Sequence, residues 1–171
     1  MGIFVRRIRP TDGAALKAIR LQALLDAPSA FGSSHAREVG RADDEWERRA
    51  QDSAVGDRGV LLLAFRDEQA IGLVGAFRPD DAPEGAELIS MWVAPGERRL
   101  GVAGRLVRAV VDWWTTTDAE SLMLWVTDGN EPALRLYESI GFEDAGERRR
   151  LPSDPGRSEI RMRLHSAPPA R

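Results

Sequence analysis

The chain begins with a short stretch of alternating apolar and charged residues, followed by apolar residues at helical spacing. Residues 3–9 mix apolar and charged side chains in a broadly alternating order before Pro10, which predicts a half-buried strand. Thr11 or Asp12 is suited to cap a helix that runs to about Asp26. Apolar residues recur along this helix, and we expect its buried face to be formed by Ala15, Ile19, Leu21 and Leu25.

The next segment is rich in loop-forming residues. Residues 27–40 contain proline, glycine and serine, so we expect a long insertion, with a second short helix around 44–50. Three apolar runs come next. They predict an antiparallel hairpin and a further strand over 59–65, 69–77 and 86–93.

The second half of the chain alternates helices and strands. Asn130 and Pro132 carry helix-start signals, and Gly141 is placed as a helix terminator. Together with the apolar spacing, these signals predict helices over 102–116 and 130–140 and strands over 121–127, 142–151 and 158–165. The element order indicates one α/β domain over 1–165, with a mixed sheet, helices on both faces and a flexible tail over 166–171.

Composition narrows the classes of function. The 171 residues are 43% hydrophobic and 30% charged, as in an ordinary globular domain. There is no cysteine, and the two histidines show no ligand spacing, so we expect neither disulfides nor a metal site. A net charge of -3 with scattered basic residues argues against nucleic acid as a partner. No signal or membrane-spanning pattern is found, so we expect a cytoplasmic protein with no membrane partner.

The stretch from 95 to 106 carries the most chemical information. It connects a predicted strand to an amphipathic helix through small residues that let a ligand approach the main chain: Gly101, Ala103 and Gly104. Arg98 and Arg99 add positive charge beside the helix start, which suits a pyrophosphate. Small residues at such a turn also allow close packing, so the loop alone leaves an ordinary strand-to-helix connection open. The stretch has neither a P-loop ending nor the Rossmann glycine spacing.

This loop resembles the pyrophosphate-binding pattern of the GNAT superfamily of acetyl-CoA-dependent N-acetyltransferases, Arg/Gln-x-x-Gly-x-Gly/Ala. Here the pattern is occupied by Arg98, Arg99, Leu100, Gly101, Val102 and Ala103. Downstream, Asn130, Tyr137 and the pair Gly141 and Phe142 resemble a second signature of the same superfamily. The resemblance covers nearly the whole chain and is weakest in the N-terminal insertion.

The resemblance implies a GNAT-type fold, with a mostly antiparallel sheet, one splayed parallel strand pair and acetyl-CoA in the gap as acyl donor, without a metal. The implied cofactor contacts are Met91, Trp92, Val93, Arg98, Arg99, Leu100, Gly101, Val102, Ala103, Gly104, Asn130, Ala133 and Tyr137. Backbone N–H groups near Trp92 and Val93 would polarise the thioester carbonyl.

The resemblance also assigns catalytic roles. Tyr137, the only tyrosine, is the expected general acid for the departing thiolate, and Glu87 is the expected base that takes a proton from the amine. For Tyr137 the alternative is a core aromatic, and for Glu87 a solvated strand-end carboxylate. His35 or a water chain is the alternative base.

The acceptor is less constrained than the donor. The resemblance places it beside the N-terminal insertion, where we expect contacts from Phe31, Ser33, Ser34 and His35. The long insertion favours a small-molecule primary amine, and the alternatives are a protein N-terminus or lysine, or a non-catalytic acyl-CoA-binding module. We also expect a homodimer formed through the closing strands over 142–151 and 158–165.

Overall fold

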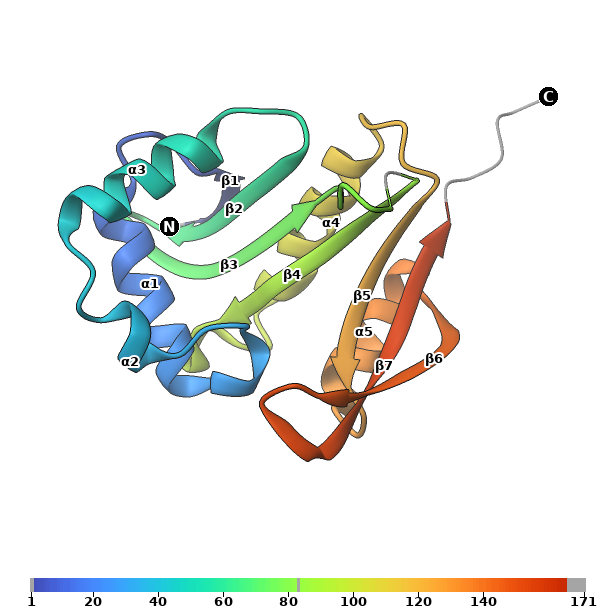
Figure 1. Cartoon of the computed structure of the whole chain (residues 1–171). Coiled ribbons are helices and arrows are strands. Elements are labelled where there is room, and N and C mark those ends of the chain that lie inside the picture. Colours follow the sequence, from blue (N-terminus) through green and yellow to red (C-terminus); the bar gives the residue numbers. More distant parts are fainter. Residues whose placement is uncertain (1, 83, 166–171) are drawn as a thin grey trace.

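The computed structural model describes residues 2–82 and 84–165, which form a single seven-stranded sheet flanked by helices (Figure 1). The strand order is β1-β2-β3-β4-β5-β7-β6, and every neighbouring pair is antiparallel except β4 and β5. The strands are β1 Ile3–Arg7, β2 Gly59–Arg66, β3 Gln69–Phe77, β4 Gly85–Val93, β5 Ser121–Thr127, β6 Glu143–Leu151 and β7 Asp154–His165.

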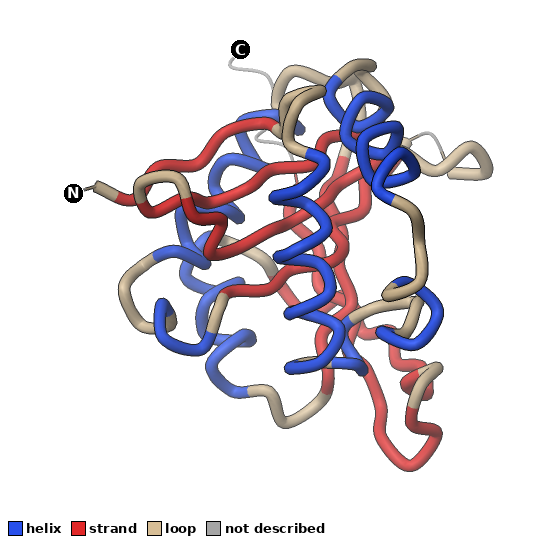
Figure 2. The backbone as a smooth tube through the Cα atoms, turned by 90° about the vertical axis from the view of Figure 1, so that its left-hand side faces the viewer, coloured by secondary structure: helices blue, strands red, loops and turns tan. Residues whose placement is uncertain are grey.

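Helices cover both faces of the sheet, as the side view shows (Figure 2). The α-helices are α1 Gly13–Asp26, α2 His35–Glu38, α3 Asp43–Ala54, α4 Val102–Trp114 and α5 Glu131–Ile140. Two short 3-10 turns, η1 Pro28–Ala30 and η2 Pro95–Glu97, follow α1 and β4. Helices α1 and α3 pack on one face, whereas α4 and α5 pack on the other. The expected mixed, mostly antiparallel sheet is therefore confirmed.

The apolar runs of the central strands are explained by burial on both faces. In β2, Leu62 belongs to the core cluster under α4 and α5, while its neighbour Leu63 belongs to the cluster under α1 and α3. Successive side chains on a strand point to opposite faces, so a strand between two helical layers needs apolar residues at every position.

The strand pair β4 and β5 is joined over only three positions. Gly85, Ala86 and Glu87 pair with residues 121–123, and beyond Glu87 the two strands diverge (Figure 1). Strand β5 continues to pair with β7, whereas β4 continues to pair with β3. The sheet is therefore continuous, but it is split from one end between β4 and β5.

Several local expectations were wrong. Asp12 precedes α1, but its side chain makes no cap; it binds Arg6 Nη1 at 2.6 Å and the Arg9 N–H at 2.6 Å. The side chains that α1 buries are Leu16, Ile19, Ala23 and Leu24, whereas Leu25 is 67% exposed. The prediction was confirmed for Ile19, whereas Ala15 and Leu21 are only partly buried. The rest of the buried stripe lies about one position away from the expected one and packs in one cluster with Leu63 and Leu73.

Element boundaries also shift. Strand β1 ends at Arg7, the segment 27–40 contains the extra helix α2, α4 ends at Trp114, and β7 begins at Asp154. Strand β7 begins earlier than the predicted residue 158, because Pro155 and Gly156 do not prevent strand pairing there. Leu151 of β6 already pairs with Asp154 of β7. The expected tail over 166–171 lies outside the described residues.

Candidate active site

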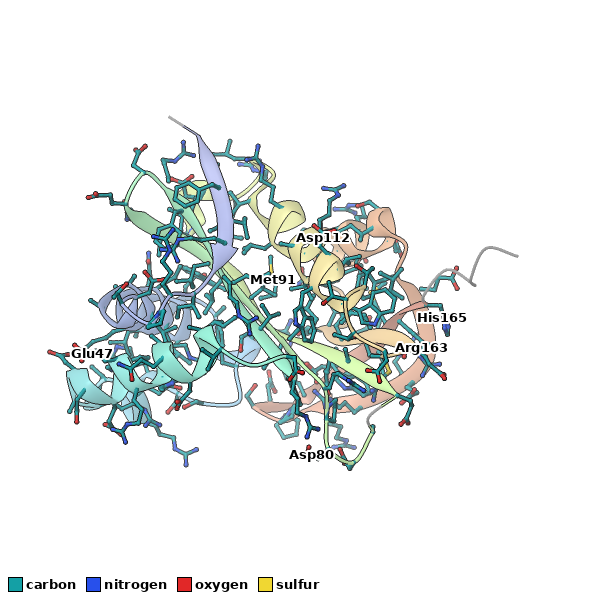
Figure 3. The ribbon with its side chains drawn as sticks, turned by 90° about the horizontal axis from the view of Figure 1, so that it is seen from above. Glu47, Asp80, Met91, Asp112, Arg163 and His165 are labelled. Atoms are coloured by element: carbon teal, nitrogen blue, oxygen red, sulfur yellow. The ribbon has the colours of Figure 1, made fainter. Side chains whose placement is uncertain are left out.

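The split between β4 and β5 coincides with a distortion of β4. Ser90 has a φ of +56°, and the register between β3 and β4 shifts at this point, so that β4 carries an extra residue opposite Val74. A bulge of this kind turns backbone groups out of the ladder. Met91 follows the bulge and lies centrally, between Glu47 of α3 and Asp112 of α4 when seen from above (Figure 3). The main chain of β4 is therefore irregular where the strands diverge.

The loop before α4 presents an open helix start. Gly101 has a φ of +79°, and no side chain caps α4. A Cβ on Gly101 would meet no atom within 4 Å, so the loop faces open space. The first N–H groups of a helix lack intrahelical acceptors and attract anions. Val102 and Gly104 are buried against the core, so backbone N–H groups are the part of this helix start that could receive an anion.

Arg98 is held by the protein itself. Its Nε donates to the Val93 carbonyl at 3.0 Å, and its Nη2 donates to the Asp26 carboxylate, which also accepts from Trp92 Nε1 at 2.8 Å. Trp92 is 4% exposed, so its ring lies in the core. Arg99 and Leu100, in contrast, are exposed. Of the two loop arginines, Arg99 is the one without a protein partner among the described residues.

The second predicted signature forms the start and interior of α5. The Asn130 side chain accepts from the Ala133 N–H at 3.4 Å, so it caps α5. Gly141, with a φ of +108°, ends the helix. The Asn130 amide is exposed and has further hydrogen-bonding capacity.

Tyr137 lies on the inner side of α5. Its side chain is 6% exposed and its ring makes an edge contact with Phe142, with 5.6 Å between centroids. Burial raises the pKa of the phenol above its ordinary value, so the hydroxyl stays protonated at neutral pH. No described residue accepts or donates a hydrogen bond at this hydroxyl. The ring is thus a core aromatic with an available proton.

Glu87 occupies the last paired position before the split and forms no ion pair with a described residue. It lines a cavity of about 350 Å³ at the edge of the split. The wall of this cavity comes from three parts of the chain: Ser29–Gly32 after α1, Glu87–Ser90 of β4, and the C-terminal strands with the turn between β6 and β7. This last part supplies Trp125, Arg149, Leu151, Pro152, Ser153 and Glu159.

The four expected acceptor contacts are not brought together. Phe31 lines this cavity, but Ser33, Ser34 and His35 do not. Ser33 hydrogen-bonds Glu38, and His35 begins α2. The chain turns away from the split after Gly32 because α2 anchors Glu38 in the interior.

Other groups near the split were not found from sequence. Arg149 lies over the Trp125 ring at 4.2 Å and pairs with Glu159 at 2.7 Å. Arg20 of α1 donates to Ser90 Oγ at 3.3 Å. These contacts join strands and helices that are 10 to 70 residues apart. No sequence signal could have identified them, since charged residues are frequent along the whole chain.

Comparison with known proteins settles the family. The profile of the acetyltransferase (GNAT) family matches residues 22–142. This chain belongs to the GNAT family. A mycothiol acetyltransferase of Brachybacterium faecium is 30% identical over 137 residues, which cover 79% of this chain and 39% of that protein. A mycothiol acetyltransferase of Sanguibacter keddieii is 28% identical over 149 residues, covering 84% of this chain and 44% of that protein. The chain thus spans about two-fifths of these relatives.

Solved structures show the same GNAT fold. An acetyltransferase of the GNAT family from Streptococcus pneumoniae superimposes with a TM-score of 0.79 at 20% identity, over 96% of this chain and all of that one. Salmonella typhimurium yncA, solved with its cofactor acetyl-CoA, superimposes with a TM-score of 0.80 at 16% identity. The match covers 99% of this chain and 98% of that one. Within residues 2–82 and 84–165, no helix is long and apolar enough to span a membrane, and no three potential metal ligands cluster.

Proposed function

We propose that this GNAT protein is an N-acetyltransferase that moves the acetyl group of acetyl-CoA onto a primary amine of a small molecule in a ternary complex. The observation that carries the proposal is the juxtaposition of an uncapped helix start at Gly101 with a split sheet at Glu87. The first suits a pyrophosphate, and the second leaves backbone groups of β4 free for an extended arm. The yncA structure with acetyl-CoA supports the same donor.

The loop geometry supports this donor. Val102, Ala103 and Gly104 begin α4 with N–H groups that no side chain caps. Arg99 is exposed and supplies positive charge, while Arg98 fixes the loop to Val93 and Asp26. In this proposal, Met91, Trp92 and Val93 supply the main chain along the split, and Asn130 and Ala133 contact the donor from the start of α5. Acetyl-CoA supplies the activated acetyl carbon and a thiolate leaving group.

The chemical step asks two things of the protein. Glu87 accepts the proton that the amine loses as its nitrogen bonds to the acetyl carbon. Tyr137 donates its hydroxyl proton to the sulfur as the carbon–sulfur bond breaks. The unpaired carboxylate and the protonated phenol fit these roles, and the products are an amide and free thiol.

A small acceptor is supported by the bounded cavity of about 350 Å³ beside Glu87. Phe31 and Leu151 form apolar walls, while Glu87 and Glu159 attract a cationic amine before it is deprotonated. The relatives that carry the name mycothiol acetyltransferase are consistent with a small acceptor. A cytoplasmic location, where acetyl-CoA is available, is part of the same proposal.

The proposed homodimer would use the exposed outer edge of β6, the last strand of the sheet. Charged side chains interrupt this edge: Arg148 pairs with Asp144 and Arg149 with Glu159, and Arg150 is exposed, which limits edge-to-edge pairing. Sedimentation equilibrium at micromolar concentration measures the mass, and a value of 18.9 kDa would contradict the dimer.

The deciding experiment measures acetyl-CoA consumption with a panel of primary amines and small peptides, with mass detection of products. We expect acetylated small amines. Acetylation of peptides alone would move the acceptor to the protein class, and acetyl-CoA binding without any acetylated product would reduce the chain to a binding module.

A further inference from the structure

A second and larger cavity lies on the α1 and α3 face of the sheet. Its volume is about 670 Å³, and its walls come from α1, α3, the loop before β2 and strands β2 to β4. It meets the smaller cavity at Ile89 and Ser90, which line both. The bulge of β4 therefore lies between the two cavities, and an acceptor bound at the split could enter either of them.

The larger cavity contains two arginines that share one carboxylate. Arg20 Nη2 and Arg49 Nη1 each lie 3.1 Å from a different oxygen of Glu38, which is 2% exposed. Burial alone would raise the pKa of Glu38, but hydrogen bonds from Arg20, Arg49 and Ser33 outweigh it and lower the pKa to about 2. Glu38 is thus always charged at neutral pH. Two guanidinium groups against one carboxylate leave one positive charge in excess.

These guanidinium groups are fixed in position. Arg20 stacks over Phe31 at 4.6 Å and donates to Ser90 Oγ at 3.3 Å, so it reaches the bulge itself. Arg49 stacks over Trp46 at 4.7 Å. Its Nε and Nη2 have no hydrogen-bond partner among the described residues, and its side chain is 36% exposed. Arg49 therefore offers a prepared donor pair to an anion in the cavity.

The other charged groups of the larger cavity are more exposed. Arg58 pairs with the Asp80 carboxylate, and Asp52 and Asp57 are exposed to solvent. Solvent screens these groups more than it screens Arg20, whose side chain is 12% exposed. The smaller cavity has an excess of negative charge, since its charged lining residues are Glu87, Glu159 and a single arginine, Arg149. The less exposed charges therefore differ on the two sides of Ser90: Arg20 and Arg49 outnumber Glu38 on one side, and Glu87 and Glu159 outnumber Arg149 on the other.

We propose that the acceptor is an amine that also carries a carboxylate, with the amine on the Glu87 side of Ser90 and the carboxylate bound by Arg49 and Arg20. This inference rests on the proposed acetyl transfer, because it specifies the class of acceptor in that reaction.

The test uses matched pairs that differ only in the carboxylate: methionine with methioninamide, and 4-aminobutanoate with 4-aminobutanamide. Each is titrated into the CoA complex by calorimetry and assayed for acetyl transfer. At least one acid is expected to bind more tightly than its amide. Arg49→Gln is expected to weaken binding and kcat/KM for that acid about 10- to 100-fold, the range for a lost charge-assisted hydrogen bond.

The variants separate recognition from folding. Arg49→Lys keeps the charge and is expected to recover part of the preference, since it lacks only the planar fork. Arg48→Gln is the matched control, because Arg48 is the neighbouring exposed residue of α3 and lines neither cavity. KM for acetyl-CoA is expected to stay constant in all three, which a general loss of structure would not allow.

Two results would overturn the inference: amides that bind as tightly as the acids in the parent, or an Arg49→Gln variant that weakens acid and amide equally. Binding of the acid with an Arg49-dependent preference but without acetyl transfer would retain the site and contradict the proposed function. The calorimetric titration therefore distinguishes the two failures.

Discussion

Asp26, the last residue of α1, forms an ion pair with Arg98, the first residue of the proposed pyrophosphate loop over 98–104, across 72 positions of sequence. The same carboxylate accepts from the Trp92 indole at 2.8 Å, and these bonds lower the pKa of Asp26, with Trp92 as the main cause. A carboxylate at a helix C-terminus is unfavourable by itself, so its partners explain its presence. This contact joins the end of α1 to the loop before α4.

Replacing Asp26 separates its two contacts. Asp26→Asn keeps an acceptor for Trp92 and loses a partly exposed ion pair, so the free energy of unfolding should fall by less than about 1 kcal/mol. Asp26→Ala also leaves the buried indole N–H unpaired and should cost about 1–3 kcal/mol. Urea denaturation at pH 7 measures both. Equal losses in the two variants would show that the Trp92 bond contributes nothing.

The pyrophosphate loop is tested at Gly101. Gly101→Glu places a negative side chain into the open space before α4, and CoA affinity should fall at least tenfold because like charges meet at the anion site. Gly146→Glu is the control for backbone strain, since Gly146 has a φ of +78° and equally open surroundings on β6. Calorimetry that finds equal CoA affinity in both folded variants would remove the loop from the donor site.

Tyr137→Phe removes only the hydroxyl. Turnover should fall about 100-fold or more, the effect of losing a general acid, while the melting temperature and CoA affinity change little. The ring remains available for the edge contact with Phe142. Parent-like turnover would leave Tyr137 as a core residue alone.

Glu87→Gln keeps the shape of the side chain and removes the proton acceptor. Turnover should fall most at low pH, where little of the amine is neutral and the base is needed most. Glu68→Gln, in the exposed turn between β2 and β3, serves as the control. Superimposable pH–rate profiles for parent and Glu87→Gln would assign the proton to a water chain or to His35.

Glu38 links stability to pH. Its pKa is about 2 in the folded protein against 4.5 as its usual value, so its stabilising effect is complete above about pH 4.5 and disappears as pH falls to about 2. Glu38→Gln should therefore lose about 3 kcal/mol at pH 7, from 1.36 kcal/mol for each pKa unit. Thermal melts of parent and variant should converge near pH 2. A constant gap between pH 7 and pH 2 would contradict the charged pairing.

Most elements of the fold could be predicted because their signals are local. The two-sided apolar runs of β2 and β3, the helical spacing in α4, and Asn130 and Gly141 at the ends of α5 depend only on residues a few positions apart. The predictions were wrong where a residue distant in sequence determines the contact. Asp12 binds Arg6 in place of capping α1, and the sheet chose a buried face of α1 that the sequence pattern did not single out.

The features of the candidate site also divide into those predicted from local sequence and those that depend on distant contacts. The sequence by itself determined the family resemblance, the glycine-bearing loop over 98–104 and the candidates Glu87 and Tyr137, since each lies within one local segment: strand β4, the loop before α4, or helix α5. Only the tertiary structure decided that Arg98 is bound by Asp26, that β4 bulges at Ser90, and that Arg20 and Arg49 share Glu38 beside a second cavity. The physical reason is that an ion pair or a cavity wall depends on side chains that become neighbours only when the sheet and helices pack.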